Sequence, residues 1–344
     1  MSSRQPLVSV VTPVHNGEPH LATCIESVLR QTYNNWEYIV VDNCSTDASS
    51  VTIRRYADRD PRIRVYTNRD LLPVIANHNA AFRLLAEESR YCKLLHADDF
   101  MLPTCLAEMV ALGEAAPSVG IVGSYALYGV RVSCQGLSYP TGSSPLLPPH
   151  TVISGRDISR LTLLGRLYPF LSPSCLLIRS DLVRARDPYY DERILHADVA
   201  ACYDLLQKAD FGFVHQVLIY VRDHAESITS SFSRRLNRFI TANLDLLLRY
   251  GPVFLAPEEF EQRRREAMTQ YYRFLARNVL RRVDRAEFWK FHRQELDALG
   301  LGFSRARLGA AAILELLDIP LNLKQALKHL PGVRTLSRHR GEPT

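Results

Sequence analysis

Short apolar runs alternate with helix-patterned segments through the first hundred residues, and this alternation restricts the possible folds more than any other feature of the chain. The apolar runs are rich in β-branched residues and predict buried strands at 7–11, 36–41, 63–66 and 91–95. Apolar residues recur with helical spacing between these runs, at 19–30, 49–56 and 76–88. The pattern predicts an α/β fold in which a mostly parallel sheet is sandwiched by helices.

Polar residues gather where three of the expected strands end, at 12–16, 42–47 and 98–99. In such sheets ligands bind outside the carboxyl ends of the strands, so we expect the functional site there. A cluster such as 42–47 is also typical of a turn followed by a helix cap, and that alternative stays open. The sequence has no Gly-x-Gly-x-x-Gly after the first strand and no P-loop motif, which argues against dinucleotide binding and P-loop phosphate transfer.

Asp98 and Asp99 follow an apolar strand directly and are the strongest local indication of chemistry. Two adjacent carboxylates repel each other unless a cation or hydrogen-bond donors offset their charge. A hard divalent cation such as Mg²⁺ or Mn²⁺ takes oxygen ligands of this kind and can bridge to a diphosphate. The alternative is that both residues only cap a helix beginning near Pro103, and spacing alone leaves the two interpretations open.

Four motifs occur in order along the chain: Val10–Asn16, Tyr38–Asp47, Ala76–Asn79 and Lys93–Asp99. Together they resemble the signature of glycosyltransferase family 2, whose members have the GT-A fold, and the resemblance covers roughly residues 6–230. It implies an inverting enzyme that moves a sugar from a nucleoside diphosphate donor, a UDP-sugar above all, to a hydroxyl of a glycan or lipid-linked acceptor. The expected setting is cell-surface glycan or polysaccharide assembly, with Mn²⁺ or Mg²⁺ as cofactor.

The resemblance also implies roles for single residues. Asp98 is expected to contact the ribose, Asp42 to hydrogen-bond the base, and Asp99 to ligate the metal on the diphosphate. The rest of the donor nucleotide site is expected to consist of Thr12, Pro13, Asn16 and Asn77. The chain departs from the family pattern at His96 and Asn43, where many relatives have carboxylates.

Inversion requires a base that deprotonates the acceptor hydroxyl as it attacks, and a carboxylate suits this task. The sequence Tyr190-Asp-Glu followed by Asp198 resembles the segment that carries the base in the family, which makes Asp198 the candidate, although Ala197 replaces the usual Glu. The alternative is that Asp198 is only a helix N-cap. Further along, Arg222 is expected to neutralise diphosphate charge and His224 to ligate the metal.

Positive charge is concentrated in the last third of the chain. Residues 231–344 carry 21 Lys and Arg against 12 Asp and Glu, whereas residues 1–230 carry 21 against 24. We therefore expect a catalytic domain over 1–230 and a basic helical extension over 231–344. Basic helices that also carry Phe288, Trp289, Leu308 and Ile313 suit an anionic membrane surface, and the alternative is that they only pack on the catalytic domain. Nucleic acid is not an expected partner, because no recognised module is present.

No signal peptide or membrane-spanning segment is predicted, and the seven cysteines form no Cys-x-x-Cys pair. These observations favour a cytoplasmic location, with peripheral attachment to the inner face of the membrane as a further possibility. Two other functions stay open. A sugar nucleotidyltransferase would need a basic, glycine-rich loop after the first strand, which residues 12–16 do not supply. A catalytically inactive sugar-nucleotide-binding scaffold is compatible with the departures at Asn43, His96 and Ala197.

Overall fold

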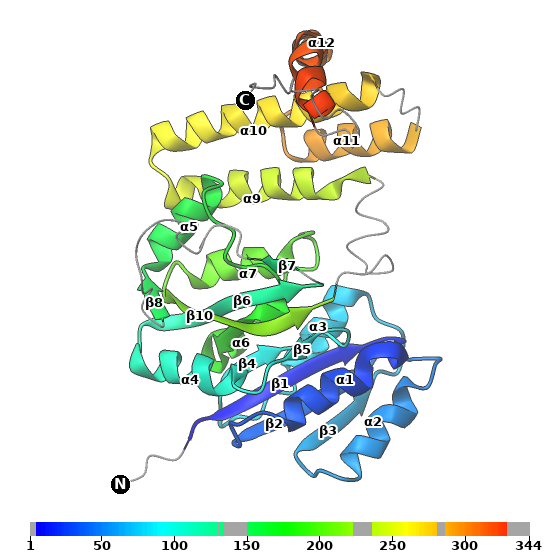
Figure 1. Ribbon diagram of the computed structural model, residues 1–344, viewed down its shortest axis with the longest axis vertical. Helices are drawn as coiled ribbons and strands as arrows, with labels where there is room; N and C mark the ends of the chain where they lie inside the picture. Colours follow the sequence, from blue (N-terminus) through cyan, green and yellow to red (C-terminus); the bar gives the residue numbers. More distant parts are fainter. Residues whose placement is uncertain (1–4, 130, 134–149, 223–235, 281–285, 329–344) are drawn as a thin grey trace, which may run out of the picture. The chain divides into compact units, whose positions relative to one another are not determined.

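The computed structural model describes residues 5–129, 131–133, 150–222, 236–280 and 286–328 (Figure 1). The chain separates into two compact units. One consists of Met1–Arg235 with Leu246–Pro257, and the other of Leu236–Asp245 with Glu258–Thr344. All the residues expected to form the functional site belong to the first unit, within residues 1–230.

The first unit is built on one large sheet. Its first four strands are β1 (Leu7–Val14), β2 (Trp36–Asp42), β3 (Ile63–Thr67) and β4 (Ser89–Leu94). They lie in the order β3-β2-β1-β4, and every neighbouring pair among them is parallel. The four predicted strands are therefore present, and the α/β fold class is confirmed. Because both faces of this part of the sheet are covered, strands β1 and β2 are buried along almost their whole length.

The remaining strands make the rest of the sheet mixed. They are β5 (Phe100–Met101), β6 (Val119–Tyr128), β7 (Arg131–Ser133), β8 (His150–Ile153), β9 (Leu176–Arg179) and β10 (Asp210–Val221). Strand β9 runs antiparallel to both β4 and β6, whereas β10 is parallel to β6. The short strands β5 and β8 pair antiparallel with β10, and β7 pairs with β6. The parallel arrangement predicted from the strand–helix alternation thus holds for the first four strands.

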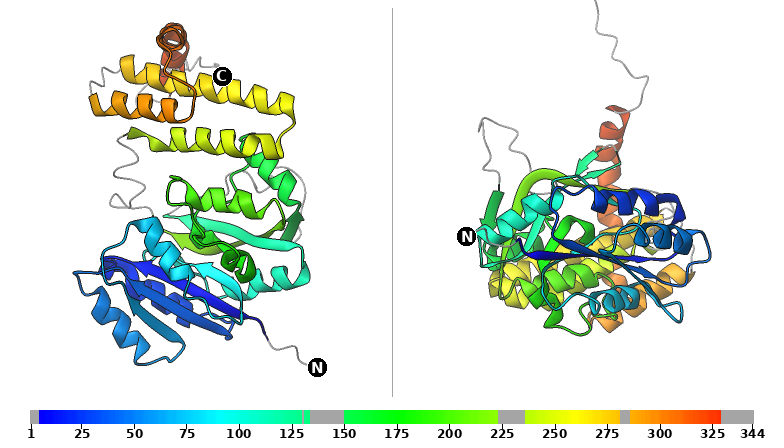
Figure 2. Two further views of the ribbon diagram at one scale, coloured as in Figure 1. Left: turned by 180° about the vertical axis from the view of Figure 1, so that it is seen from behind. Right: turned by 90° about the horizontal axis from the view of Figure 1, so that it is seen from below.

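Helices cover both faces of this sheet. They are α1 (Glu18–Leu29), α2 (Ser49–Ala57), α3 (Val74–Phe82), α4 (Cys105–Ala115), α5 (Gly155–Leu163), α6 (Ser180–Arg184) and α7 (Ala197–Leu205), with a 3₁₀ turn η1 (Pro173–Cys175). Helices α1 and α3 lie on opposite faces of the parallel part, as Figures 1 and 2 show. This follows from right-handed crossovers, because the chain reverses its direction across the sheet after β3.

One predicted helix is shorter than expected. The helix predicted over 76–88 ends at Phe82, with Arg83 as its C-cap. The Glu37 carboxylate on β2 accepts a hydrogen bond from the Ala86 backbone N–H at 2.8 Å, so this N–H does not continue the helical ladder. Leu85 is nevertheless buried, and it therefore adds an apolar residue at helical spacing to a segment that is a turn.

The second unit is helical and includes α10 (Pro257–Leu280), α11 (Ala286–Ala298) and α12 (Arg305–Lys328), together with the first part of α9 (Arg238–Phe254). Its core contains Tyr271, Leu275, Phe288 and Leu296 around the buried His292. The imidazole of His292 bonds the Tyr271 hydroxyl at 2.6 Å and the Leu236 carbonyl at 2.9 Å. The predicted helical C-terminal region is present. No helix in the described part of the chain is long and apolar enough to cross a bilayer.

Candidate functional site

Asp98 and Asp99 lie in the tight turn that joins the carboxyl end of β4 to β5. Helix α4 begins only at Cys105, with Thr104 as its N-cap, and strand β5 intervenes. The two aspartates are therefore not caps of that helix, and this alternative is wrong. Their place at the end of a central parallel strand is the position at which open α/β sheets bind ligands.

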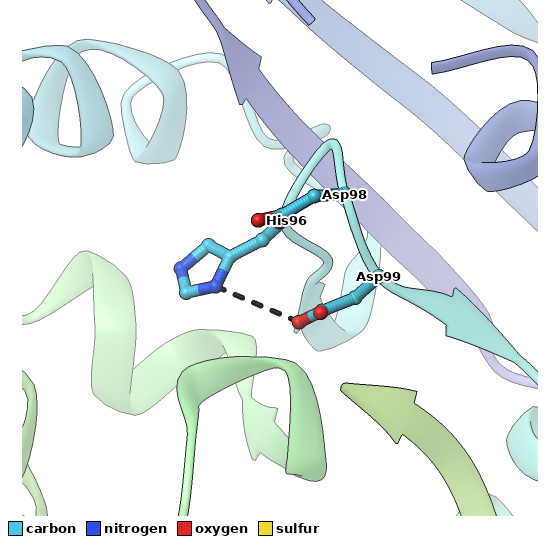
Figure 3. Close-up of side chains that lie close together, drawn as sticks. All are labelled: His96, Asp98 and Asp99. Atoms are coloured by element: carbon cyan, nitrogen blue, oxygen red, sulfur yellow. Dashed lines mark ion pairs between the residues drawn. The ribbon is translucent and has the colours of Figure 1, made fainter. Parts of the chain in front are cut away.

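His96, Asp98 and Asp99 form a cluster in which one ligand atom of each lies within 4.8 Å of the others (Figure 3). The Asp99 carboxylate is 2% exposed. Its Oδ1 accepts a hydrogen bond from the Arg222 backbone N–H at 3.0 Å. Its Oδ2 is buried without a hydrogen-bond partner among the described residues, and His96 Nδ1 lies 3.7 Å from it. Burial raises the pKa of Asp99, the neighbouring charge of His96 opposes this, and that of Asp98 adds to it.

This cluster fits a divalent cation. A buried carboxylate oxygen without a partner is costly unless something outside the described residues satisfies it. Two carboxylates and an imidazole offer the oxygen and nitrogen donors that divalent metals accept in proteins. His96 occupies one of the three positions, so the donor set contains a nitrogen where the family pattern usually places a carboxylate oxygen.

Arg222 approaches the cluster from the end of β10. Besides the backbone bond to Asp99, its Nε donates to the Asp98 carbonyl at 3.1 Å. The antiparallel register pairs Tyr220 with Phe100, and their rings stack with centroids 4.6 Å apart. Residues more than a hundred positions apart in the sequence are thus brought together as expected. The second residue of that predicted pair, His224, lies outside the described residues.

A buried lysine supports the turn that carries Asp98 and Asp99, a role that the sequence analysis did not predict. Lys93 on β4 is fully buried, and its ammonium donates to the carbonyls of Ser174 at 2.6 Å and Leu176 at 3.2 Å. The Ser174 hydroxyl in turn accepts a hydrogen bond from the His96 backbone N–H at 3.0 Å. Burial lowers the pKa of Lys93. The strand that carries the cluster is therefore tied to the segment 174–176 at Lys93 and at His96.

The loops after β1 and β2 are joined by hydrogen bonds. Asn16 has a φ of 52°, and its Oδ1 accepts from the Thr46 backbone N–H at 2.8 Å. The Asn16 backbone N–H donates to the Ser45 hydroxyl at 3.0 Å. Asn tolerates the left-handed region better than most residues, which explains its place at this bend. Asn16 is exposed at the sheet edge, where the sequence predicted part of the donor site.

One of the expected nucleotide contacts, Thr12, needs correction, and a second, Asp42, is hydrogen-bonded within its own turn. Thr12 is fully buried: its hydroxyl donates to the Leu95 carbonyl at 2.8 Å and accepts from the Tyr38 hydroxyl at 3.0 Å. Its side chain points into the core, so it does not line a nucleobase pocket. Asp42 is 3% exposed, and its two oxygens accept from Ser45 N at 3.0 Å and Ser50 Oγ at 2.5 Å. These bonds hold the turn into α2, as the turn alternative expects, and the contact of Asp42 with the base stays a prediction.

An amide network at the ends of β2 and β3 was missed by the sequence reasoning. Asn68 Nδ2 donates to Oδ1 of both Asn43 and Asn77, at 2.8 Å in each case. The Asn43 carbonyl oxygen lies 2.8 Å from Nδ1 of His15, which follows the end of β1. Asn77 is therefore joined to the strand ends, and its nucleotide contact stays a prediction; His15, Asn43 and Asn68 are added to the candidate site. Their position just after strand ends was the available signal.

Asp198 lies in the first turn of α7, where His196 is the N-cap, so the N-cap interpretation of Asp198 is wrong. The residue is half-buried and lines a narrow, mostly apolar pocket together with Phe82, Leu94, Phe170, Tyr190 and Cys202. The segment before α7 is fixed by the buried Asn79, whose side chain accepts from Tyr190 N at 2.8 Å and donates to Tyr190 O at 2.9 Å. The Asp198 carboxylate thus has a fixed position in a pocket that β4 and β9 help to line.

Comparison with known proteins places this site in a family. The model of the family described as Glycosyl transferase family 2 matches residues 9–186, slightly more than half of the chain. Bacillus subtilis TuaG, named for a proposed glycosyltransferase role in teichuronic acid biosynthesis, is 36% identical over 100 residues, which are 29% of this chain and 38% of TuaG. The O-antigen biosynthesis protein RfbC of Myxococcus xanthus is 36% identical over 122 residues, 35% of this chain and 9% of RfbC. The chain spans less than half the length of these relatives.

Solved structures show the same fold at low identity. Staphylococcus aureus TarS 1-349, solved with UDP-GlcNAc, is 16% identical with a TM-score of 0.62, covering 93% of this chain and 92% of that one. The Pyrobaculum calidifontis mannosyltransferase PcManGT, solved with GDP-Man and Mn²⁺, is 14% identical with a TM-score of 0.55, covering 95% and 85%. These likenesses extend over the helical C-terminal region as well as the sheet.

Proposed function

Because the chain belongs to glycosyl transferase family 2, we propose that it transfers a sugar from a nucleoside diphosphate sugar to a hydroxyl acceptor with inversion of configuration. The observation that carries the proposal is the buried His96–Asp98–Asp99 cluster at the end of β4, with Arg222 bonded to it. A buried carboxylate with one unpartnered oxygen, beside a guanidinium, is suited to a metal-bound diphosphate. The proposed catalytic part is residues 1–230.

The donor would lie along the carboxyl ends of β1, β2 and β4. Asp99, Asp98 and His96 would hold Mn²⁺ or Mg²⁺, which when bound supplies positive charge against the diphosphate. Arg222 adds a second positive charge beside the same turn. Pro13, Asn16, Asp42 and Asn77 are proposed to bind the nucleoside, together with His15 and Asn43. A UDP-sugar is the proposed donor, and the UDP-GlcNAc complex of the similarly folded TarS supports this choice.

Asp198 is proposed to take the proton from the acceptor hydroxyl. Asp198 stands in the first turn of α7 and faces the pocket, and a carboxylate positioned within hydrogen-bond reach of the acceptor hydroxyl can accept its proton. The pocket around it is mostly apolar, so the proton transfer would take place away from bulk water. A glycan or lipid-linked acceptor in surface polysaccharide assembly is proposed, in keeping with the names of TuaG and RfbC.

Donor binding and turnover are tested separately. Thermal shifts of the full chain with UDP and UDP-sugars, with and without Mn²⁺, should show a larger rise with the metal, because a ligand that binds only the native state stabilises it. Asp99→Asn should remove the metal-dependent part of the rise. The exposed Asp58, the C-cap residue of α2, supplies the control Asp58→Asn, which should behave as the parent. Equal shifts in the Asp99→Asn variant and the parent would contradict the metal site.

The role of Asp198 is tested by kinetics. Asp198→Asn should lower kcat by roughly two to four orders of magnitude, the usual contribution of a positioned base. The Kd of the donor should stay unchanged, since the base acts on the acceptor. If the parent binds UDP-sugar with metal but transfers nothing to any member of an acceptor panel, the sugar-nucleotide-binding scaffold becomes the better interpretation.

A further inference from the structure

Helix α12 (Arg305–Lys328) presents four large apolar side chains to the outside. Ile313, Leu314, Leu316 and Leu317 are 61%, 50%, 51% and 66% exposed. The residues of this stretch that are buried are instead Ala311 and the charged Glu315. A surface helix normally turns its apolar side to the core and its charges to solvent, so this part of α12 is oriented the opposite way.

Specific contacts within the second unit hold α12 in this orientation. Glu315 accepts from Nε of Arg273 at 2.5 Å and from Nε of Arg277 at 2.8 Å, both on α10. At the start of the helix, the Tyr272 hydroxyl accepts from the Ser304 backbone N–H at 2.8 Å. Figure 1 shows α12 crossing α10 on the side away from α11. The apolar side is therefore turned outward by polar contacts on the opposite side.

Burial in the structure decides which of the residues expected to face a membrane are available for contact. Phe288, expected from the sequence to face a membrane, is buried with its ring centroid 4.3 Å from that of His292. Leu308 is half-buried, and Ile313 is exposed. Four exposed apolar residues thus lie close together on α12, and we call Ile313, Leu314, Leu316 and Leu317 the α12 patch.

Charge favours one kind of partner for the α12 patch. Residues 305–328, which form α12, carry four Lys and Arg against two Asp and Glu. Arg305 and Arg307 are exposed in the first turn, while Glu315 is already paired with two arginines. A second copy of the chain would bring two such basic surfaces together, and like charges oppose this. Exposed leucines among basic residues on one helix are typical of helices that lie on anionic lipid.

We infer that the α12 patch docks on an anionic membrane surface, with α12 lying in the headgroup region. Its leucines would enter the boundary of the acyl chains, and Arg305 and Arg307 would meet lipid phosphates. Attachment of this kind is reversible and weakens with salt, because screening shortens the reach of the arginines. The inference does not depend on the proposed glycosyl transfer.

The experiment is co-sedimentation of the full chain with vesicles of phosphatidylcholine alone or of equal parts phosphatidylcholine and phosphatidylglycerol. The parent should pellet only with the anionic vesicles, and less as salt rises from about 0.1 M to about 1 M. Leu314→Gln/Leu317→Gln keeps helix propensity and removes apolar contact, and it should weaken the partition coefficient roughly tenfold or more. Arg305→Gln/Arg307→Gln should weaken binding to anionic vesicles and flatten the salt dependence.

Val51→Gln is the matched control, because Val51 is 69% exposed on α2 in the other unit. It should bind as the parent does. The inference is overturned if the parent stays in the supernatant with anionic vesicles, or if the Leu314→Gln/Leu317→Gln variant binds as tightly as Val51→Gln. Light scattering without lipid tests the other possible occupant of the patch, a second copy of the chain. A parent dimer that the leucine substitutions dissociate would assign the patch to that second copy and overturn the membrane assignment.

Discussion

Asn79 offers the sharpest test of how the segment carrying Asp198 is held. Its side chain is 2% exposed and satisfies both backbone groups of Tyr190, which is itself buried. Asn79→Ala leaves one N–H and one C=O without partners in the interior. Each such group costs about 1–3 kcal/mol, so the free energy of unfolding should fall by roughly 2–5 kcal/mol.

The assay must report on the unit that contains Asn79. The chain has two tryptophans, Trp36 in the first unit and Trp289 in the second. In a Trp289→Phe background, Trp36 fluorescence follows urea unfolding of the first unit alone. With a urea m-value of about 2–3 kcal/mol/M for a unit of this size, the midpoint should drop by roughly 1–2 M. Under conditions where the variant is folded, kcat should fall more than donor affinity, because Tyr190 precedes the helix that carries Asp198.

Asn34→Ala is the control, since Asn34 is an exposed amide in the first unit. Its effect should stay within about 0.5 kcal/mol, as for most surface substitutions. An Asn79→Ala midpoint within about 0.2 M of the parent would refute the reasoning, because it would show that the Tyr190 backbone finds other partners at little cost.

Three further outcomes are expected. Thr12→Val should lower the free energy of unfolding by about 1–3 kcal/mol, because the Leu95 carbonyl loses its donor, and should leave nucleotide affinity in titration calorimetry unchanged. Burial lowers the pKa of His292 to about 4 from its ordinary value near 6.5, so the unfolded chain binds a proton that the folded one does not. The stability that is present above pH 6.5 should therefore be lost as the pH falls toward 4. Urea titrations should show a loss of up to about 3 kcal/mol. Glu315→Gln should cost about 1 kcal/mol, since its arginine partners are partly exposed, and circular dichroism during urea unfolding measures it.

The strands were predictable because burial on both faces gives a continuous apolar run that needs no knowledge of the partner strand. The end of α3 was not predictable. The buried Leu85 continues the helical spacing of apolar residues, although it lies in a turn in which the Ala86 N–H donates to Glu37. The sequence also could not predict the direction in which the side chains at the strand ends point. Thr12 and His15 lie in one motif, yet one faces the core and the other follows the strand into the site.

The Asp98–Asp99 turn shows why a site can be located from sequence without its supporting contacts. The two aspartates can be recognised from the sequence, because two adjacent carboxylates after an apolar strand need a counter-charge. Their partner Arg222 gives no local signal, and only the family resemblance suggested it. What brings it close is β5, a strand of two residues and so too short to produce any periodic pattern. Pairing of Phe100 with Tyr220 sets the register, and a shift of one residue would turn Arg222 to the other face of the sheet. The position of that positive charge beside Asp99 therefore depends on a pairing that only the folded chain contains.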